Sequence, residues 1–310
     1  MYAHSVHNVQ TMIYSNLIMK KIFFIVNPIS GKGKHNITAD YIKTFFDEKA
    51  FDIHVLYSTY KRHAIELTQQ ALSAGADVIV ACGGDGTIHE VATQVVGKDV
   101  VFGVVPVGSG NGLASNLSIP KDIEQAIIRV RDGKVMNMDV GSINGEYFFS
   151  NMGFGIDATI IDNYEKSGKR KLGAYIKAAL NSAQQYKAKR MLVTYKGQTK
   201  EVNPLLLFIS NSNEMGYNMS LTPKASLTDG LLDYLMVPKI NLLKQLTFGL
   251  YVILKKTEKF RKTDYVQSDH ITVEIIGQER NGFQMDGEYY EYDTNQFEIR
   301  VIKGGLRVLC

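Results

Sequence analysis

Short apolar runs alternate with amphipathic segments through the first 134 residues of the chain. Strands are predicted at 22–26, 51–57, 77–81 and 100–105, with helices at 63–73, 88–96 and 122–133. The runs at 22–26, 77–81 and 100–105 are almost entirely apolar, as in strands that are covered on both faces. Strands that alternate with helices at this spacing predict a doubly wound α/β domain with a parallel sheet.

Beyond residue 135 the predicted strands follow one another closely, which is typical of antiparallel structure. They lie at 138–143, 146–151, 191–195, 205–210, 231–237, 271–276 and 296–301. Turn signals at Asn144-Gly145, Lys196-Gly197 and Asn281-Gly282 separate several of them. Helices are predicted at about 171–186 and 241–257. We therefore expect a nucleotide-binding α/β domain at 19–134 and a β-sandwich-like domain at 135–310, with the active site in the cleft between them. Whether the last strand returns to the first domain stays open.

Residues 1–18 have no clear periodicity and lack the pattern of a signal peptide. The pattern becomes that of a buried strand directly after Met19. Two interpretations are equally compatible with this change. Either Met19 is the natural start and 1–18 form a disordered extension, or 1–18 form an arm on the surface.

Composition excludes several classes of protein. The 310 residues are 45% hydrophobic and 21% charged, with a net charge of +4, which is ordinary for a globular protein and does not demand a nucleic-acid partner. No apolar run approaches the roughly 18 residues of a membrane span. The two cysteines, Cys82 and Cys310, cannot form a disulfide framework, and Cys82 is expected to be a buried thiol. A cytoplasmic location is expected.

A glycine-rich segment, Gly83-Gly84-Asp85-Gly86-Thr87, lies between a predicted buried strand and a predicted helix. Glycines allow the backbone to approach a bound group, and the exposed N–H groups at a helix N-terminus favour a phosphate. Thr87 can donate a hydroxyl hydrogen bond, and Asp85 can hold Mg²⁺ directly or through water. The alternative is a turn that serves packing alone, which three glycines around an acidic residue make the weaker interpretation.

A second segment, Gly108-Ser109-Gly110-Asn111-Gly112, repeats this arrangement one strand later. The ends of parallel strands meet at one edge of a sheet, where α/β proteins bind ligands. Asn27, Ser30, Gly31 and Thr59 follow earlier strands and can reach the same crevice. The spacing is neither that of a Walker A loop nor that of a dinucleotide fingerprint.

Together these segments resemble the diacylglycerol kinase and sphingosine kinase family of lipid kinases. The resemblance depends on five motifs in the family's order: Asn27-Pro28-x-Ser30-Gly31, Gly83 to Thr87, Gly108 to Gly112, Pro223-x-Ala225-x-Leu227-x-Asp229-Gly230-Leu231-Leu232, and Asp286-Gly287-Glu288. It covers nearly everything from Lys20 to Cys310. It implies a two-domain kinase that binds ATP and Mg²⁺ in the interdomain cleft and phosphorylates a lipid hydroxyl.

The resemblance also implies roles for individual residues. Asp286 is similar to the family's general base, and Glu288 and Asp85 would organise magnesium. Asp229, with the backbone carbonyls of Ser226 and Leu231, resembles a structural magnesium site. The nucleotide would be held by residues of the loops described above: Asn27, Ser30, Gly31, Thr59, Gly83, Gly84, Asp85, Gly86, Thr87, Ile88, Gly108, Ser109, Gly110 and Asn111.

The chain departs from many bacterial members at one position. Gly112 stands where those members carry an aspartate, which is closer to the eukaryotic sphingosine and ceramide kinases. The change removes a carboxylate from the expected magnesium network. The sequence therefore leaves open whether the acceptor is diacylglycerol, a long-chain base or another lipid.

Asp286-Gly287 and Asp229-Gly230 also have a simpler explanation, because Asp-Gly is common in hairpin turns. Taken without the family resemblance, both pairs favour that explanation. Two rival functions also remain. An NAD kinase shares the first glycine-rich loop, although the Asn27 and Pro223 motifs fit the lipid branch better. A nucleotide-binding regulatory module without catalysis is the other rival, and the presence of Asp286 and Asp85 argues against it.

Leucines and isoleucines recur at helical spacing within 242–254, after a predicted Asn241 cap, and a basic segment follows at 255–262. A basic segment beside an apolar helix can bind anionic lipids, and a lipid kinase would contact the inner membrane surface peripherally. A helix packed on the core is the favoured interpretation of the same pattern. A homodimer is compatible with the sequence but not indicated by it.

Overall fold

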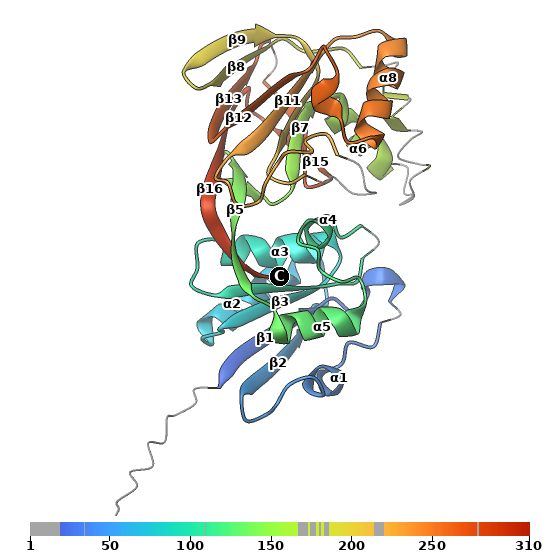
Figure 1. Cartoon of the computed structure of the whole chain (residues 1–310). Coiled ribbons are helices and arrows are strands. Elements are labelled where there is room, and N and C mark those ends of the chain that lie inside the picture. The colour runs from blue at the N-terminus through green and yellow to red at the C-terminus, as the bar shows by residue number, and fades with distance from the viewer. Residues whose placement is uncertain are drawn as a thin grey trace, which may run out of the picture.

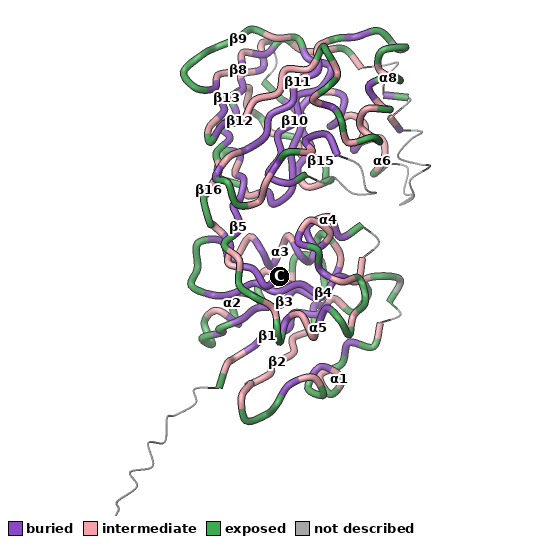
Figure 2. The backbone as a smooth tube through the Cα atoms, in the orientation of Figure 1, coloured by how far each residue is buried: buried purple, intermediate pink, exposed green. Residues whose placement is uncertain are grey.

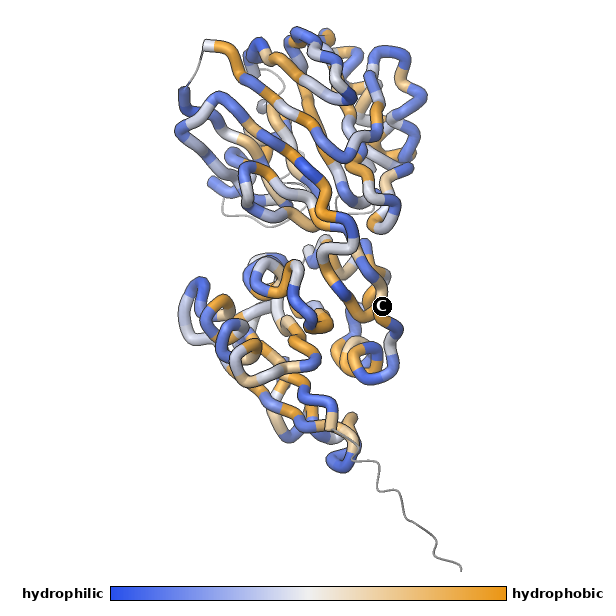
Figure 3. The backbone as a smooth tube through the Cα atoms, turned by 90° about the vertical axis from the view of Figure 1, so that its left-hand side faces the viewer, coloured by the Kyte–Doolittle hydropathy of each residue, from blue (hydrophilic) through white to orange (hydrophobic). Residues whose placement is uncertain are grey.

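A computed structural model of the chain describes residues 19–33, 35–108, 110–166, 173, 178–179, 181–182, 186–213, 220–277 and 279–310. The chain forms two lobes stacked end to end, one α/β and one rich in strands (Figure 1 and Figure 3). The predicted extension at 1–18 lies outside the described residues, as does most of the predicted helix at 171–186. Within the described part of the chain, every helix is too short or too polar to cross a membrane.

The first lobe is built on a parallel sheet, as predicted. Its strands are β1 (Lys20–Val26), β2 (Phe51–Tyr57), β3 (Val78–Gly83) and β4 (Val101–Pro106), in the order β2-β1-β3-β4. Every residue of β3 and β4 is buried (Figure 2). Helices cover both faces of the sheet, and this is why the two strands are almost entirely apolar. Cys82 is a buried thiol within β3, as expected.

The helices of this lobe are α1 (Ala39–Lys43), α2 (His63–Ser73), α3 (Asp85–Val95), α4 (Gly112–Asn116) and α5 (Ile123–Asp132). Helix α3 begins three residues earlier than predicted, because Gly84 is its N-terminal cap and Asp85 lies in its first turn. Helix α4 was not predicted, since five residues are too few for a periodic signal. The α5 prediction is confirmed, with the Asp122 side chain accepting from the Gln125 N–H.

The second lobe is a sandwich of two sheets, as predicted. One face comprises β5 (Val135–Ile143), β6 (Glu146–Phe148), β8 (Met191–Tyr195), β9 (Gln198–Val202), β13 (His270–Ile275) and β16 (Gln296–Leu309). The other has the antiparallel order β12-β11-β10-β7-β14-β15, built from Asp264–Ser268, Leu232–Pro238, Pro204–Ser210, Asn151–Gly155, Asn281–Met285 and Glu288–Tyr292. Aromatic rings such as Phe154, Phe283 and Phe297 fill the space between them.

The two lobes share one sheet. Strand β16 pairs antiparallel with β13 and β5 in the sandwich, then reaches the first lobe, where Val308 pairs parallel with Phe102 of β4. A bulge between Ile302 and Leu306 lets the strand bend at the junction. At that bend the buried carboxylate of Asp139 accepts the Gly304 N–H (2.7 Å) and the Gly230 N–H (2.6 Å). The parallel strands of the first lobe and the antiparallel strands of the sandwich therefore belong to one sheet, which has ten strands in the described part of the chain.

Two further predictions need correction. Asn281-Gly282 is not a turn but the start of β14, where Asn281 and Gly282 pair with Tyr292 and Glu291 of β15. The Tyr289 side chain occupies the space beside Gly282, so this position needs a glycine for packing and not for a turn. The helix predicted at 241–257 is α8 (Leu242–Ile253), followed by a short 3₁₀ turn at Thr257–Lys259. Its predicted Asn241 cap is confirmed. A further helix, α6 (Ile156–Lys166), was not predicted.

Candidate active site

The first glycine-rich loop places the N-terminus of α3 at the edge of the parallel sheet. Gly84 is extended, and Asp85, Gly86 and Thr87 form the first helical turn. The Asn27 amide, at the end of β1, donates to the Thr87 hydroxyl at 3.0 Å. A Cβ at Gly83 would collide with the Thr87 side chain, so glycine is required there. The loop thus presents a helix N-terminus, with its partial positive charge, at the predicted crevice.

Asp85 fastens the second glycine-rich loop to the first. Its carboxylate accepts the Asn111 N–H at 2.8 Å and the Gly112 N–H at 2.6 Å, one on each oxygen. A Cβ on Gly108 would lie only 2.7 Å from the Gly84 Cα, so the two backbones need glycine to approach this closely. Ser109, predicted to bind the nucleotide, lies outside the described residues.

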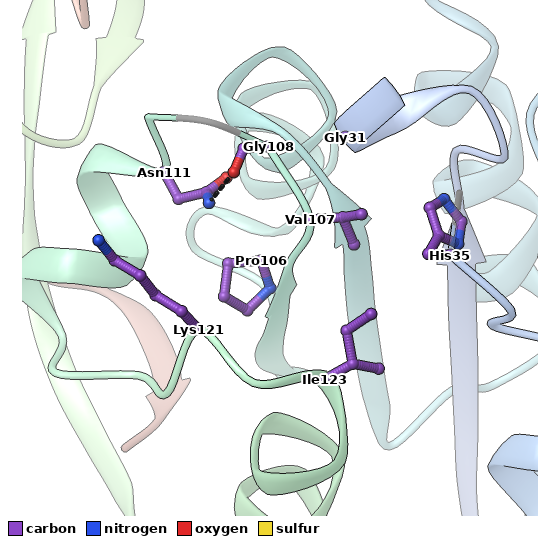
Figure 4. Close-up of a pocket in the computed structure, with 8 residues that line it drawn as sticks. All are labelled: Gly31, His35, Pro106, Val107, Gly108, Asn111, Lys121 and Ile123. Carbon is purple, nitrogen blue, oxygen red and sulfur yellow. Dashed lines mark hydrogen bonds between the residues drawn. The ribbon is translucent and has the colours of Figure 1, made fainter. Parts of the chain in front are cut away.

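The loop after β1 packs against the ends of β3 and β4, where the two glycine-rich loops begin. The Ser30 hydroxyl accepts the Gly84 N–H at 3.3 Å, and Gly31 (φ 60°) lies against the Val107 carbonyl, where a Cβ would collide. A cavity of about 300 Å³ opens between this loop and the second glycine-rich loop (Figure 4). Its walls are formed by Gly31, His35, Pro106, Val107, Gly108, Asn111, Lys121 and Ile123.

The cavity includes some predicted nucleotide residues and adds others. Gly31, Gly108 and Asn111 were predicted from the sequence, whereas His35 and Lys121 carry no distinct signal in it. Thr59 does not line this cavity. Instead, its N–H donates to the His63 ring at 3.1 Å at the start of α2. The role of Thr59 in nucleotide binding remains a prediction.

Asp286 lies in the tight turn between β14 and β15, where both Asp286 (φ 50°) and Gly287 (φ 84°) are left-handed. The hairpin explanation of this pair is therefore correct for its backbone. Its carboxylate does more than close a turn, because it accepts three backbone N–H groups at the start of β7: Phe149 (2.8 Å), Ser150 (2.8 Å) and Asn151 (3.1 Å). These donors fix the orientation of the carboxylate.

The fourth donor to Asp286 comes from the other lobe. His89, on α3, places its Nδ1 3.3 Å from Asp286 Oδ2. Burial lowers the pKa of His89, but Asp286, Glu288 and Glu146 together raise it above its ordinary value. A carboxylate has about four lone-pair sites. The three N–H groups and His89 therefore occupy the hydrogen-bonding capacity of Asp286.

Glu288 approaches the same place from β15. Its carboxylate lies near Gly86, in the first turn of α3, and accepts from the Tyr290 hydroxyl at 3.4 Å. Asp85 and Glu288 thus flank the helix N-terminus from two lobes. Oxygen ligands of this kind suit Mg²⁺, which usually binds one or two carboxylates together with phosphate oxygens and water. Among the described residues, no group of three or more His, Cys, Asp or Glu side chains forms a ready metal cluster.

The predicted second cation site surrounds Asp229. One of its oxygens accepts the Leu231 N–H at 3.0 Å. The Gln267 amide lies 3.5 Å from Asp229 Oδ2 and 3.3 Å from Asp233 Oδ2, so the two carboxylates are neighbours. Burial, followed by the charge of Asp229, raises the pKa of Asp233. A cation at Asp229 would relieve this repulsion, whereas the part of the Ser226 and Leu231 carbonyls in such a site remains a prediction.

Asp157, in the first turn of α6, is a buried acid that no motif in the sequence marks. Its Oδ2 has no hydrogen-bond partner in the described part of the chain. Burial raises the pKa of Asp157 to about 6, although a hydrogen bond with Gln284 opposes the shift. Gln284 also donates to Asn151 and accepts the Gly287 N–H, so Asp157 supports the network around the Asp286 turn.

His89 and Asp157 were missed because each looks like an ordinary polar residue in its helix. A signal for His89 existed, since it lies one turn after the first glycine-rich loop. Nothing in the local sequence marks Asp157. The structure brings Asn27, Ser30, Gly31, the two glycine-rich loops, Asp286 and Glu288 to one region, and leaves Ser226, Asp229 and Leu231 near the bend of β16.

Comparison with known families matches both lobes. Residues 21–143 match the diacylglycerol kinase catalytic domain, and residues 150–310 match the YegS C-terminal NAD kinase beta sandwich-like domain. These two ranges together span almost all of the described chain.

Individual relatives and one solved structure agree with the family match. The chain is 33% identical to a diacylglycerol kinase of Staphylococcus aureus (strain JH9) over 72% of each chain. It is 26% identical to a diacylglycerol kinase of Bacillus subtilis (strain 168), over 87% of this chain and 90% of the relative. A crystal structure of a protein assigned to the diacylglycerol kinases of Bacillus anthracis str. Sterne superposes with a TM-score of 0.76 at 25% identity, covering 94% of this chain and 95% of the other.

Proposed function

This chain belongs to the diacylglycerol kinase family, and we propose that it transfers the γ-phosphoryl group of ATP to a hydroxyl group of a lipid. The observation that carries the proposal is the hydrogen bond between Asp286 and His89 of α3. That contact joins a carboxylate of one lobe to the helix whose N-terminus is formed by the first glycine-rich loop of the other. Phosphoryl transfer needs little more than positioned phosphates, neutralised charge and a group that accepts the proton of the attacking hydroxyl.

In this proposal the glycine-rich loops bind the phosphates of ATP. Backbone N–H groups and the dipole of α3 attract the anionic phosphates, and the close approach of Gly84 to Gly108 keeps side chains out of their way. The cavity beside Gly31 and Asn111 is of a size for part of a nucleotide, with the exposed Lys121 at its rim. Bound Mg²⁺ would neutralise phosphate charge, with Asp85 and Glu288 as the carboxylates in reach.

Asp286 is the proposed general base. As the acceptor oxygen forms its bond to the γ-phosphorus, the bond from that phosphorus to the bridging oxygen of ADP breaks. The proton of the hydroxyl passes to the Asp286 carboxylate, which the N–H groups of Phe149, Ser150 and Asn151 hold in a fixed orientation. The products are a lipid phosphate and ADP.

His89 is a positioning residue for this base. Because it takes the last free lone-pair site of Asp286, it must share or release that contact when the acceptor hydroxyl arrives. His89 also joins the proposed base, by a direct hydrogen bond, to the lobe that carries the glycine-rich loops. The pair therefore links the position of Asp286 to the closure of the two lobes.

The acceptor class comes from the family. Diacylglycerol, or a long-chain base, is the proposed acceptor, and Gly112 leaves the choice between them to experiment. Such acceptors reside in a bilayer, so we propose that the protein acts in the cytoplasm, at the inner membrane surface. Partners in this proposal are ATP and lipid, without a nucleic acid, and a homodimer is not required.

The direct test incubates the purified full chain with Mg²⁺, γ-labelled ATP and vesicles that contain diacylglycerol and a sphingoid base. Separation of the products by lipid chromatography should show one labelled lipid phosphate. A parallel reaction with NAD tests the rival kinase. Labelled NADP without labelled lipid would replace the proposal by an NAD kinase, and ATP binding without any product would support a non-catalytic module.

A further inference from the structure

Helix α8 presents an apolar face to solvent. Leu243, Leu246, Leu250 and Ile253 are 74%, 52%, 60% and 63% exposed, and Leu254, directly after the helix, is 61% exposed. Their spacing places them along one side of the helix. The opposite side packs on the lobe through Phe248, which is buried. We call the five exposed side chains the α8 apolar face. The sequence pattern favoured a core-facing helix, and this is wrong for that face.

A cluster of cations follows the α8 apolar face directly. Lys256, Lys259, Arg261 and Lys262 are all exposed, and none of them forms an ion pair with a described residue. We call these four the α8 basic cluster. An exposed face of five large aliphatic side chains costs solubility, because a monomeric soluble protein rarely leaves large apolar residues contiguous. Their position beside four exposed cations that have no ion-pair partner among the described residues indicates an amphiphilic ligand that is apolar and anionic.

We propose that the α8 apolar face and the α8 basic cluster form a docking surface for an anionic lipid bilayer. The leucine and isoleucine side chains would enter the boundary between headgroups and acyl chains, while the cations contact the anionic headgroups. This proposal goes beyond the proposed kinase function, although a lipid acceptor in the same bilayer gives the surface its purpose.

A second copy of the chain fits the surface less well. A two-fold interface buries the same patch of both copies, so the α8 basic clusters of the two chains would meet or lie near each other. Four cations on each side, none of them paired with a described residue, would repel, since like charges oppose association. An anionic bilayer neutralises the same cations.

The docking surface and the proposed base border the same layer of helices. Helices α6 and α8 cover the same outer face of the six-stranded sheet, where Ile156 and Phe248 share one apolar cluster with Phe208 of β10. Helix α6 in turn reaches the Asp286 hairpin, because its Glu165 side chain accepts the Tyr289 N–H at 3.0 Å. A bilayer bound at α8 therefore lies against the layer that borders the proposed base.

The test measures co-sedimentation of the full chain with vesicles of phosphatidylcholine alone or with about a third phosphatidylglycerol, without ATP. Leu246→Gln/Leu250→Gln should weaken binding to anionic vesicles at least about tenfold, and glutamine preserves helix propensity. Lys259→Gln/Lys262→Gln should weaken it about fivefold for each cation removed. Lys49→Gln/Lys98→Gln removes two exposed cations of the other lobe and should bind like the parent.

Equal binding of both α8 variants and the parent would overturn the proposal. So would a parent dimer in gel filtration that Leu246→Gln/Leu250→Gln converts to a monomer without any change in vesicle binding, because a second copy would then be the occupant. Since no turnover is measured, a failed kinase assay leaves this result intact. Failed vesicle binding likewise leaves the kinase proposal standing if phosphorylation of a short-chain, water-soluble diacylglycerol persists.

Discussion

The Nδ1 atom of His89 lies 3.3 Å from Oδ2 of Asp286, across 197 residues of sequence and between two lobes. The Phe149 ring packs edge-on against the same imidazole, with centroids 5.5 Å apart. Phe149 also donates its backbone N–H to Asp286. The two lobes thus contact each other through the group that we propose as the base. The orientation of Asp286 and the contact between the lobes consequently depend on the same few residues.

Asp286→Asn should remove phosphoryl transfer while retaining nucleotide binding. An amide cannot accept the hydroxyl proton at neutral pH, so kcat should fall about 10²–10⁴-fold. The ATP dissociation constant, measured by titration calorimetry, should change less than about threefold, because the glycine-rich loops are untouched. Asp293→Asn, at an exposed acid beyond β15, is the matched control and should behave like the parent. Parental activity in Asp286→Asn would remove Asp286 from the mechanism.

His89→Gln should lower kcat by roughly 10–100-fold, since a small displacement of a positioned group is costly. The pH dependence separates positioning from folding. Because the pKa of His89 is raised, its contribution to stability is complete below about 6.5 and is lost as pH rises through the raised pKa. The urea midpoint of the parent should therefore fall toward that of His89→Gln above this range. His270→Gln, at an exposed histidine, should leave both profiles unchanged. If the urea midpoints of the parent and of His89→Gln differed by the same amount at every pH, this role for His89 would be contradicted.

Asp85→Ala should raise the KM for ATP about tenfold or more and shift the magnesium dependence. It leaves the Asn111 and Gly112 N–H groups without their acceptor, so the second loop loses its attachment to α3. Asn241→Ala is the control, because it removes the side-chain cap of α8 in the other lobe, at a cost of about 1 kcal/mol and away from the glycine-rich loops. If both variants weaken ATP use equally, the effect of Asp85 is one of stability alone.

The Asp229 site should show a magnesium-dependent stability that is separate from the nucleotide. Without ATP, Mg²⁺ at about ten times its dissociation constant should add about 1.4 kcal/mol, or roughly 2 °C in Tm for a chain of 310 residues. Asp229→Ala should abolish the increase, and Asp85→Ala should retain it. A parent whose Tm is indifferent to Mg²⁺ would leave Ser226, Asp229 and Leu231 as an ordinary loop.

Asp157→Asn should stabilise the protein at neutral pH. Burial raises the pKa of Asp157 from 3.8 to about 6, so the folded state holds a proton that the unfolded state has lost between these values. Stability therefore falls as pH rises through this window, by about 3 kcal/mol at most. The variant lacks this penalty, and its advantage in urea unfolding at pH 7.5 should vanish near pH 4. An equal midpoint difference at both pH values would contradict the assignment.

Sequence alone determined the local parts of this protein. Continuous apolar runs specify strands buried on both faces, and the glycines of the two loops mark places where backbones meet without room for a Cβ, as between Gly84 and Gly108. Both signals come from a residue and its near neighbours. These signals can be predicted from the sequence because secondary structure and turn geometry depend on a few neighbouring residues. The predicted sheet of the first lobe and the sandwich of the second were correct for that reason.

Only the tertiary structure decided which side chains share a site. The pairing of His89 with Asp286, the joining of the lobes through β16, and the solvent exposure of the α8 apolar face each depend on how distant segments pack. The spacing that puts leucines on one side of α8 is the same whether that side meets a core or water. A periodic sequence specifies the faces of an element, whereas the packing of the whole chain determines what each face contacts.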